Sequence, residues 1–426
     1  MMFRTATASL ACLGLLLGGP AAAADDPAAE VRRIKQLSVE QARELVATFK
    51  GEGVEREDEA GRPFRLAAGL PLDGLESLSP EVAEVLAGFK GMGLSLGGLT
   101  TISPEAARPL AGFRFGTLSL GGLTTLTPES AAALATCKSR TLALDGVADL
   151  SPAAAAALSE FKGFLRLGGL AKLEPETAAA LARLKGQGLS LAGLEELSPP
   201  AARALAGLQG RVLVFAGLKT LEPETAAALA SLKSRTLDLG GLRELTPEAA
   251  RALVAGQSAS LFLDGLTTLS PETARELQAF AGPRLSLAVL ATFTPESAAA
   301  VAAWQRWDGM LPGLTGFDAA DSVAVAEALA TRKGPLVLPK LKRISPRTLA
   351  ALIEKEDLLI PDLAELELIP EPDGGANEDF VIPPGFSERQ ERLKPLRERM
   401  FRRSQAEGQR GRQQGPWLRG EMQLRP

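Results

Sequence analysis

The sequence predicts an α/β repeat solenoid of about twelve repeats, with a parallel β-sheet on one side and short α-helices on the other. Two observations lead to this fold class: a Ser/Thr/Glu-Pro step recurs along the chain, and a short run of alternating leucines precedes each step. The spacing is 24 residues, except for one interval of 23. Self-similarity at such a fixed period is typical of a stacked array. The recurring prolines are Pro80, Pro104, Pro128, Pro152, Pro175, Pro199, Pro223, Pro247, Pro271 and Pro295.

The repeat around Pro128 shows how each element follows from its residues. Residues 117–120 alternate in polarity, which predicts a short strand with two inward leucines. The fixed turn glycine, here Gly122, indicates either a positive φ or a backbone approach too close for a Cβ. Thr127 is suited to cap a helix that begins at Pro128, and Glu129 complements the positive helix end.

Stacking is required because one repeat cannot bury its own apolar side chains. Each 24-residue repeat offers about seven inward apolar positions, mostly Leu and Ala. Burial of a leucine contributes roughly 1.5–3 kcal/mol. Four or five leucines per repeat can therefore offset the chain entropy once neighbouring repeats cover them.

The pattern L-x-L-x-G-L-x-x-L-[ST]-P-E-x-A resembles a bacterial variety of leucine-rich repeat, over residues 66–369. The usual asparagine ladder is missing, so the turn backbone must satisfy its hydrogen bonds in another way. The resemblance implies a protein-interaction scaffold and names no ligand. The ladder position holds Asp73, Gly97, Gly121, Asp145, Gly168, Ala192, Ala216, Gly240 and Asp264.

The N-terminal segment has the features of an export signal. Arg4 gives a positive start, residues 10–17 form a short apolar run, and residues 22–24 fit a small-residue cleavage site before Asp25. Residues 1–24 are therefore predicted to be a signal peptide. Cys12 allows a lipoprotein alternative, although the apolar run continues past it.

The remaining boundaries follow changes in composition. Residues 25–65 hold a partial repeat, in which Val39 replaces the proline, and a charged insertion at 52–65. Residues 370–386 are rich in Pro, Gly and acid, which indicates a linker. Residues 387–426 contain 11 Arg or Lys and 5 Glu, whereas residues 25–386 carry a net charge of about −11. This basic tail is expected to be disordered, with a frayed helix near residues 391–403.

The composition argues against an enzyme. The chain has no His, so the usual general base and metal ligand are missing. Cys137 occupies a helix position that holds Phe or Leu in other repeats, so it is interpreted as a core residue and not as a nucleophile. Asp73, Asp145 and Asp264 stand three to five repeats apart, so a structural turn role is preferred to a calcium site. We predict no cofactor and no metal.

The strand face is the candidate binding surface, because most of its outward side chains are small and one stretch is bulky. Arg and aromatic residues are over-represented at interface hot spots. The alternative is that the bulky stretch is incidental surface variation. Trp304 and Trp307 could anchor a partner, but we prefer to interpret them as capping residues. The candidate partner-binding residues are Phe164, Arg166, Arg211, Val212, Val214 and Phe262.

These observations predict an exported, non-catalytic protein-interaction scaffold in the secreted, periplasmic or cell-envelope fraction. The alternative is a structural cell-envelope spacer whose basic tail contacts an anionic surface. We expect a protein partner, no nucleic acid and no transmembrane segment, because Gly, Pro or charge interrupts every later apolar run.

Overall fold

The computed structural model describes residues 27–49, 54–57, 63–66, 69–304, 307, 309–374, 382 and 385–413. The chain divides into two compact units. Unit 1 comprises the residues up to Leu194 together with Gly207–Leu213, and unit 2 comprises Glu195–Ala206 and the residues from Val214 onward. The predicted signal peptide, Cys12 and residues 414–426 lie outside the described residues.

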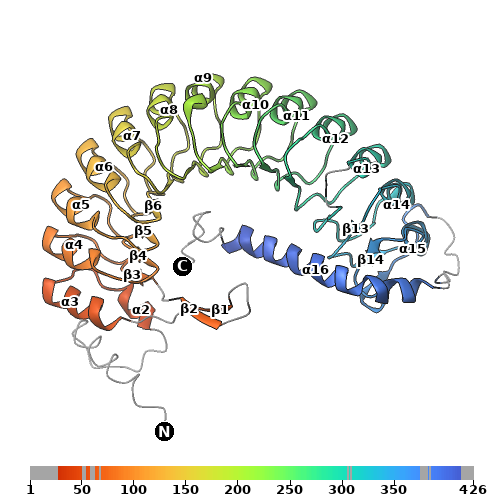
Figure 1. Cartoon of the computed structure of the whole chain (residues 1–426), viewed down its shortest axis with the longest axis horizontal. Coiled ribbons are helices and arrows are strands. Elements are labelled where there is room, and N and C mark those ends of the chain that lie inside the picture. Colours follow the sequence, from red (N-terminus) through yellow and green to blue (C-terminus); the bar gives the residue numbers. More distant parts are fainter. Residues whose placement is uncertain are drawn as a thin grey trace, which may run out of the picture. The chain divides into compact units, whose positions relative to one another are not determined.

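Strands and short helices alternate in both units, with strands in one layer and helices in the other (Figure 1). Strands β3 to β12 follow one another in sequence order in a ten-stranded sheet. Its strands are β3 (Leu70–Pro71), β4 (Gly93–Ser95), β5 (Thr117–Ser119), β6 (Thr141–Ala143), β7 (Phe164–Arg166), β8 (Gly188–Ser190), β9 (Val212–Val214), β10 (Thr236–Asp238), β11 (Ser260–Phe262) and β12 (Arg284–Ser286). The α/β repeat solenoid predicted from the period is confirmed.

The register within each unit keeps equivalent residues side by side. Leu94 pairs with Leu118, Leu118 with Leu142, and Leu142 with Leu165, all in parallel strands. Each of these leucines is at most 1% exposed. The inward leucines of neighbouring repeats therefore form one continuous buried layer, as the alternating pattern predicts.

One helix follows each strand of the ten-stranded sheet, and within each unit it contacts the helix of the next repeat. Almost all helices of the regular repeats begin at the recurring proline. In unit 1 the helices are α2 (Pro27–Val31), α3 (Val39–Thr48), α4 (Pro80–Ala87), α5 (Pro104–Leu110), α6 (Pro128–Ala135), α7 (Pro152–Leu158) and α8 (Pro175–Leu181). In unit 2 they are α9 (Pro199–Ala204), α10 (Pro223–Ala230), α11 (Pro247–Val254), α12 (Pro271–Leu277), α13 (Pro295–Ala302), α14 (Ser322–Ala330), α15 (Pro346–Ile353) and α16 (Phe386–Gln413).

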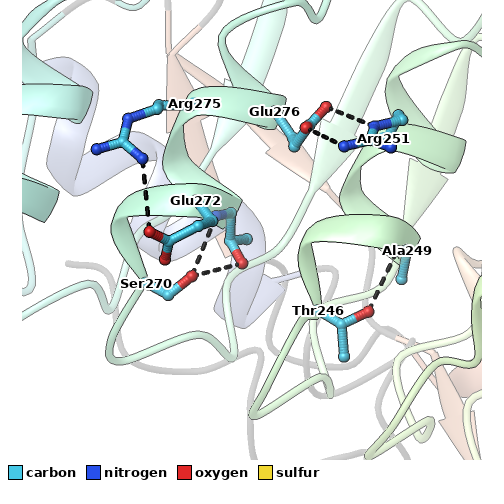
Figure 2. Close-up of polar contacts among 8 residues, drawn as sticks. Thr246, Ala249, Arg251, Ser270, Glu272, Arg275 and Glu276 are labelled. Carbon is cyan, nitrogen blue, oxygen red and sulfur yellow. Dashed lines mark hydrogen bonds and ion pairs between the residues drawn. The ribbon is translucent and has the colours of Figure 1, made fainter.

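The helix starts have the capping chemistry that the sequence predicts. Thr127 Oγ1 accepts a hydrogen bond from Ser130 N at 3.2 Å, and Pro128 occupies the first turn. Figure 2 shows the same arrangement in unit 2, where Thr246 Oγ1 accepts from Ala249 N at 3.2 Å. It also shows Arg251 of α11 bonded through two nitrogens to Glu276 of α12, at 3.1 and 2.6 Å. This ion pair links consecutive repeats on their exposed side, and it lowers the pKa of the Glu276 carboxyl.

Close packing, and not positive φ, explains the recurring turn glycine. A Cβ at Gly122 would lie 1.9 Å from the carbonyl oxygen of Gly97 in the preceding repeat. A Cβ at Gly193 would lie 1.8 Å from Gly168 O. The recurring turn glycines are not among the described residues with positive φ. Of the two explanations that the sequence leaves open, the close backbone approach is the correct one.

Aspartate side chains replace part of the missing asparagine ladder. Asp145 Oδ1 accepts a hydrogen bond from Gly168 N in the next repeat, at 3.0 Å. Asp264 Oδ1 accepts likewise from Ala288 N at 2.9 Å, and Asp73 Oδ1 from Gly97 N at 3.1 Å. The structural turn role expected for these three aspartates is confirmed.

The ends depart from the regular repeat. The capping box of Ser38 and Gln41 starts α3 at Val39, as the partial repeat predicts. In the region expected to be a charged insertion, β1 (Val54–Glu57) and β2 (Pro63–Leu66) form an antiparallel pair. In unit 2, the repeat after Pro295 lacks the recurring proline. Its helix α14 begins at Ser322, three residues beyond the expected step at 318–319. The last strands are β13 (Leu336–Val337), β14 (Arg343–Ile344), β15 (Leu358–Leu359) and β16 (Glu367–Leu368).

Candidate interaction surface

The first and last residues of each three-residue strand flank the inward leucine, and the last residue defines one row of outward side chains on the strand face of each unit. In unit 1 these side chains are Ser95, Ser119, Ala143, Arg166 and Ser190. In unit 2 they include Val214, Asp238, Phe262 and Ser286. Small side chains leave the sheet backbone close to the surface, so the few large ones dominate what this face can bind.

Arg166 is not the exposed residue that its outward position predicts. It is 4% exposed, and its guanidinium forms an ion pair with Asp145 at 2.6 Å. Burial raises the pKa of the Asp145 carboxyl, although the charge of Arg166 opposes this shift. Within the described residues, Arg166 Nε and the Oγ of its strand neighbour Ser190 are buried without a hydrogen-bond partner. Arg166 is therefore a fixed part of unit 1.

The other candidate residues of unit 1 are more accessible. Phe164 is half-buried, and its ring lies 2.8 Å from the position that a Cβ on Gly188 would take. Gly188 thus leaves the space that the ring occupies. Val212 is half-buried and Arg211 is exposed. These three side chains remain candidates for contact with a partner.

Unit 2 contains the last two candidate residues. Val214 is only 7% exposed, so it is a core side chain and not an open surface residue. Phe262 is half-buried, and the guanidinium carbon of Arg284 lies 5.0 Å from its ring centroid, in cation–π geometry. Aromatic residues and arginine are both enriched in interfaces. Partner binding by the six residues stays a prediction.

The prediction that the basic tail is disordered is wrong for residues 387–413, which belong to helix α16. Phe386 is 1% exposed, and Arg389 and Gln390 donate to the carbonyl oxygens of Ile353 and Leu358 at 2.8 and 3.2 Å. The apolar side chains of α16 recur at spacings of three, four and one residues, and they pack against the strand-face cluster of Met310, Val337 and Leu359. The packed residues are Leu393, Leu396, Met400 and Phe401. Composition alone predicted disorder because the apolar residues are few, but this spacing places them on one side of the helix.

The two tryptophans belong to the core of unit 2. Trp304 is 3% exposed, and its Nε1 donates to Ala274 O at 2.9 Å. The buried Arg332 guanidinium donates to the carbonyl oxygens of Trp304, Trp307 and Pro335. It also lies 4.7 Å from the centroid of the Trp307 ring. The tryptophans are therefore buried core residues and not exposed partner anchors, and Arg332 is a core residue that the sequence did not reveal.

Cys137 is 5% exposed, and its Sγ donates to Phe113 O at 3.4 Å, as expected for a core residue. Over the described ranges, no group of three or more Cys, Asp or Glu side chains is placed to hold a metal ion. No helix in the described part of the chain is long and apolar enough to cross a membrane.

In-register L-x-L strands, a turn and a proline-started helix every 24 residues decide the fold. The chain is leucine-rich-repeat-like. No family model matches the chain, and no curated protein matches it.

Several solved structures are similar to this repeat array. An internalin from Listeria monocytogenes has 14% identity and a TM-score of 0.44, and the match covers 82% of this chain and 97% of the internalin. A Toll–Spatzle complex structure from Drosophila gives 13% identity and a TM-score of 0.38, over 68% of this chain and 44% of that one. The TLR13–ssRNA13 complex gives 19% identity and a TM-score of 0.37, over 66% and 41%. The match thus spans less than half the length of the Toll and TLR13 chains.

Proposed function

We propose that this chain is an exported, non-catalytic scaffold that holds a protein partner on the strand faces of its repeats. The observation that carries the proposal is the docking of α16 on Met310, Val337 and Leu359. Within unit 2, these apolar outward residues accommodate one side of an amphipathic helix, which is a common mode of peptide recognition. The half-buried Phe262 stacked by Arg284 offers a further anchor of the same kind in unit 2.

The residues that test this proposal must be accessible and must not hold the fold together. Arg166 and Val214 are buried and are therefore unsuitable. Of the four accessible candidates we choose Arg211, which is exposed, and Phe262, whose ring lies beside the Arg284 guanidinium. The double variant Arg211→Ala, Phe262→Ala is expected to lose most retention of the partner in an affinity capture from a cell-envelope extract, because Arg and aromatic anchors commonly contribute about 2 kcal/mol or more each.

The matched control is Arg243→Ala, Val289→Ala, which removes an exposed arginine and an exposed apolar residue from turns. This control should retain the partner. Equal retention by both double variants would remove the strand face from the proposal.

The alternative is a structural cell-envelope spacer, and the exposed cations Arg392, Lys394 and Arg399 of α16 support it. Changing all three to Gln leaves the packed side of α16 intact. If the spacer alternative holds, the salt-sensitive association of the chain with envelope fractions should fall while partner retention is unchanged. Unchanged fractionation of this variant would argue against the alternative.

A further inference from the structure

One edge of unit 1, where the helices end and the strands begin, gathers exposed cations. The loops at this edge are stacked by main-chain hydrogen bonds between successive repeats: Thr117 N to Met92 O at 3.2 Å, Arg140 N to Gly116 O at 2.9 Å, and Phe164 N to Arg140 O at 2.8 Å. Equivalent loop residues therefore lie beside one another. We call this the cationic edge, and its basic residues are Lys90, Arg114, Lys138, Arg140, Lys162, Lys185 and Arg211.

The cations recur at a fixed repeat position. Each of five consecutive repeats has a basic residue directly after the buried residue that ends the helical segment. All five are exposed. Of these five cations, only Lys185 forms an ion pair with another described residue, Glu160, at 2.8 Å. The five are Lys90, Arg114, Lys138, Lys162 and Lys185.

Two large apolar side chains stand among these cations. Met92 is 43% exposed and Phe115 is 42% exposed. Neighbouring repeats have the small and buried residues Gly91 and Ser139 where Phe115 stands. Gly116, with φ +56°, is the one described residue of unit 1 with a positive φ, and a Cβ there would lie 1.6 Å from Met92 O. The backbone thus departs from its repeat next to an exposed phenylalanine.

The helix dipole explains only part of this pattern. Basic residues complement the negative end of a helix, which accounts for the recurring cations. It gives no reason to expose Met92 and Phe115. Exposed aromatic and aliphatic side chains ringed by Lys and Arg are the combination by which proteins bind to an anionic membrane surface.

We propose that the cationic edge of unit 1 binds an anionic lipid surface, with Met92 and Phe115 entering the acyl boundary. The opposite edge fixes the orientation, because the helices there begin with acidic residues that an anionic surface repels. These residues are Glu81, Glu105, Glu129 and Glu176. A linear polyanion would contact the cations but would not bury the apolar side chains of Met92 and Phe115.

The test uses the chain from Asp25, which is the expected mature start. Binding is measured by cosedimentation with vesicles of phosphatidylcholine alone or of phosphatidylcholine with about 30 mol% phosphatidylglycerol. The anionic content is set at roughly the level that gives a membrane a negative surface potential. The triple variant Lys90→Gln, Arg114→Gln, Lys138→Gln should bind the anionic vesicles about 100-fold more weakly, since each cation near such a surface contributes about fivefold. The control Arg108→Gln, Lys172→Gln, Arg243→Gln removes the same charge from exposed positions off this edge and should lose less than about fivefold. All variants keep the basic tail.

The double variant Met92→Ala, Phe115→Ala separates lipid from other polyanions. It should lose about tenfold in vesicle binding and nothing in binding to heparin, because only a bilayer offers an apolar interior. Equal losses in the two triple variants would overturn the proposal, as would an absence of binding to the anionic vesicles. Unchanged vesicle binding by the apolar double variant would also overturn it, because the edge would then bind by charge alone without insertion of Met92 and Phe115. Far-ultraviolet circular dichroism of each variant shows that the fold is kept.

Discussion

Replacement of Arg166 by alanine is expected to destabilise the protein by about 3–5 kcal/mol. The guanidinium is the cationic partner of Asp145, whose side chain is 21% exposed and whose Oδ1 already accepts from Gly168 N. Without Arg166, this carboxylate would be left largely buried and unpaired. The free energy of unfolding in urea measures the cost, and Lys172→Ala, at an exposed position, should stay within about 0.5 kcal/mol of the parent protein.

The loss in the Arg166→Ala variant should depend on pH. Burial raises the pKa of the Asp145 carboxyl in the folded chain, and loss of the arginine raises it further. A folded carboxyl with a raised pKa binds its proton more tightly than the unfolded one, so stability falls as pH increases from the unfolded value of about 3.9 through the folded value. The destabilisation should therefore shrink on acidification.

A double replacement distinguishes a lost charge partner from a lost packing group. Asp145→Asn together with Arg166→Met removes both charges and keeps an acceptor for Gly168 N. Removing both members of a buried pair is often neutral or stabilising, so this variant should recover most of the loss. If Arg166→Ala costs no more than Lys172→Ala, the buried ion pair is not a structural element of unit 1.

The second large effect is expected for the inward leucines. Leu142 of β6 is 0% exposed and pairs with Leu118 and Leu165 on either side. Leu142→Ala should reduce the free energy of unfolding by about 2–5 kcal/mol, because it leaves a cavity between two neighbouring repeats. Thr125→Ala, on an exposed turn, should change it by less than about 0.5 kcal/mol.

Periodicity predicts which side of an element a residue occupies, and here it predicted strands, turns and helix starts. Thr127 and Pro128 stand where their chemistry places them, because these local preferences act within one repeat. What covers an outward residue depends on distant segments, which no repeat unit encodes. The apolar side of α16 was misassigned for this reason, whereas Arg166 was misassigned because its ion-pair partner, Asp145, belongs to the preceding repeat.

Signals for both features are nevertheless present in the sequence. Asp145 lies in the turn directly after β6, and Arg166 ends the neighbouring strand β7, so the sequence separation places the two side chains in adjacent repeats. Met310, Val337 and Leu359 are apolar at outward positions that hold serine in several earlier repeats. Three apolar residues in a row on a polar face indicate a covered surface, and Leu393, Leu396 and Met400 have the spacing of the helix that covers it.

Hydroxyl groups at the third helix position form a link between repeats that was not predicted. Ser130 Oγ donates to Ile102 O at 2.7 Å, and Thr177 Oγ1 donates to Leu150 O at 3.1 Å. Each bond joins a helix to the turn of the preceding repeat. The equivalent residues on either side of Ser130, Ala106 and Ala154, cannot make this bond, so the link occurs in alternate repeats. A search for a 48-residue period would have found it.

A double-mutant cycle on Leu118 and Leu142 tests most directly whether a leucine layer shared between neighbouring repeats holds the molecule together. The two residues pair across β5 and β6. Their alanine variants should couple by about 0.5–3 kcal/mol, whereas Leu94 and Leu189, which are separated by the three strands β5, β6 and β7, should add to within about 0.5 kcal/mol. Additive losses for the neighbouring pair would contradict a shared layer and would mean that each repeat is stabilised separately.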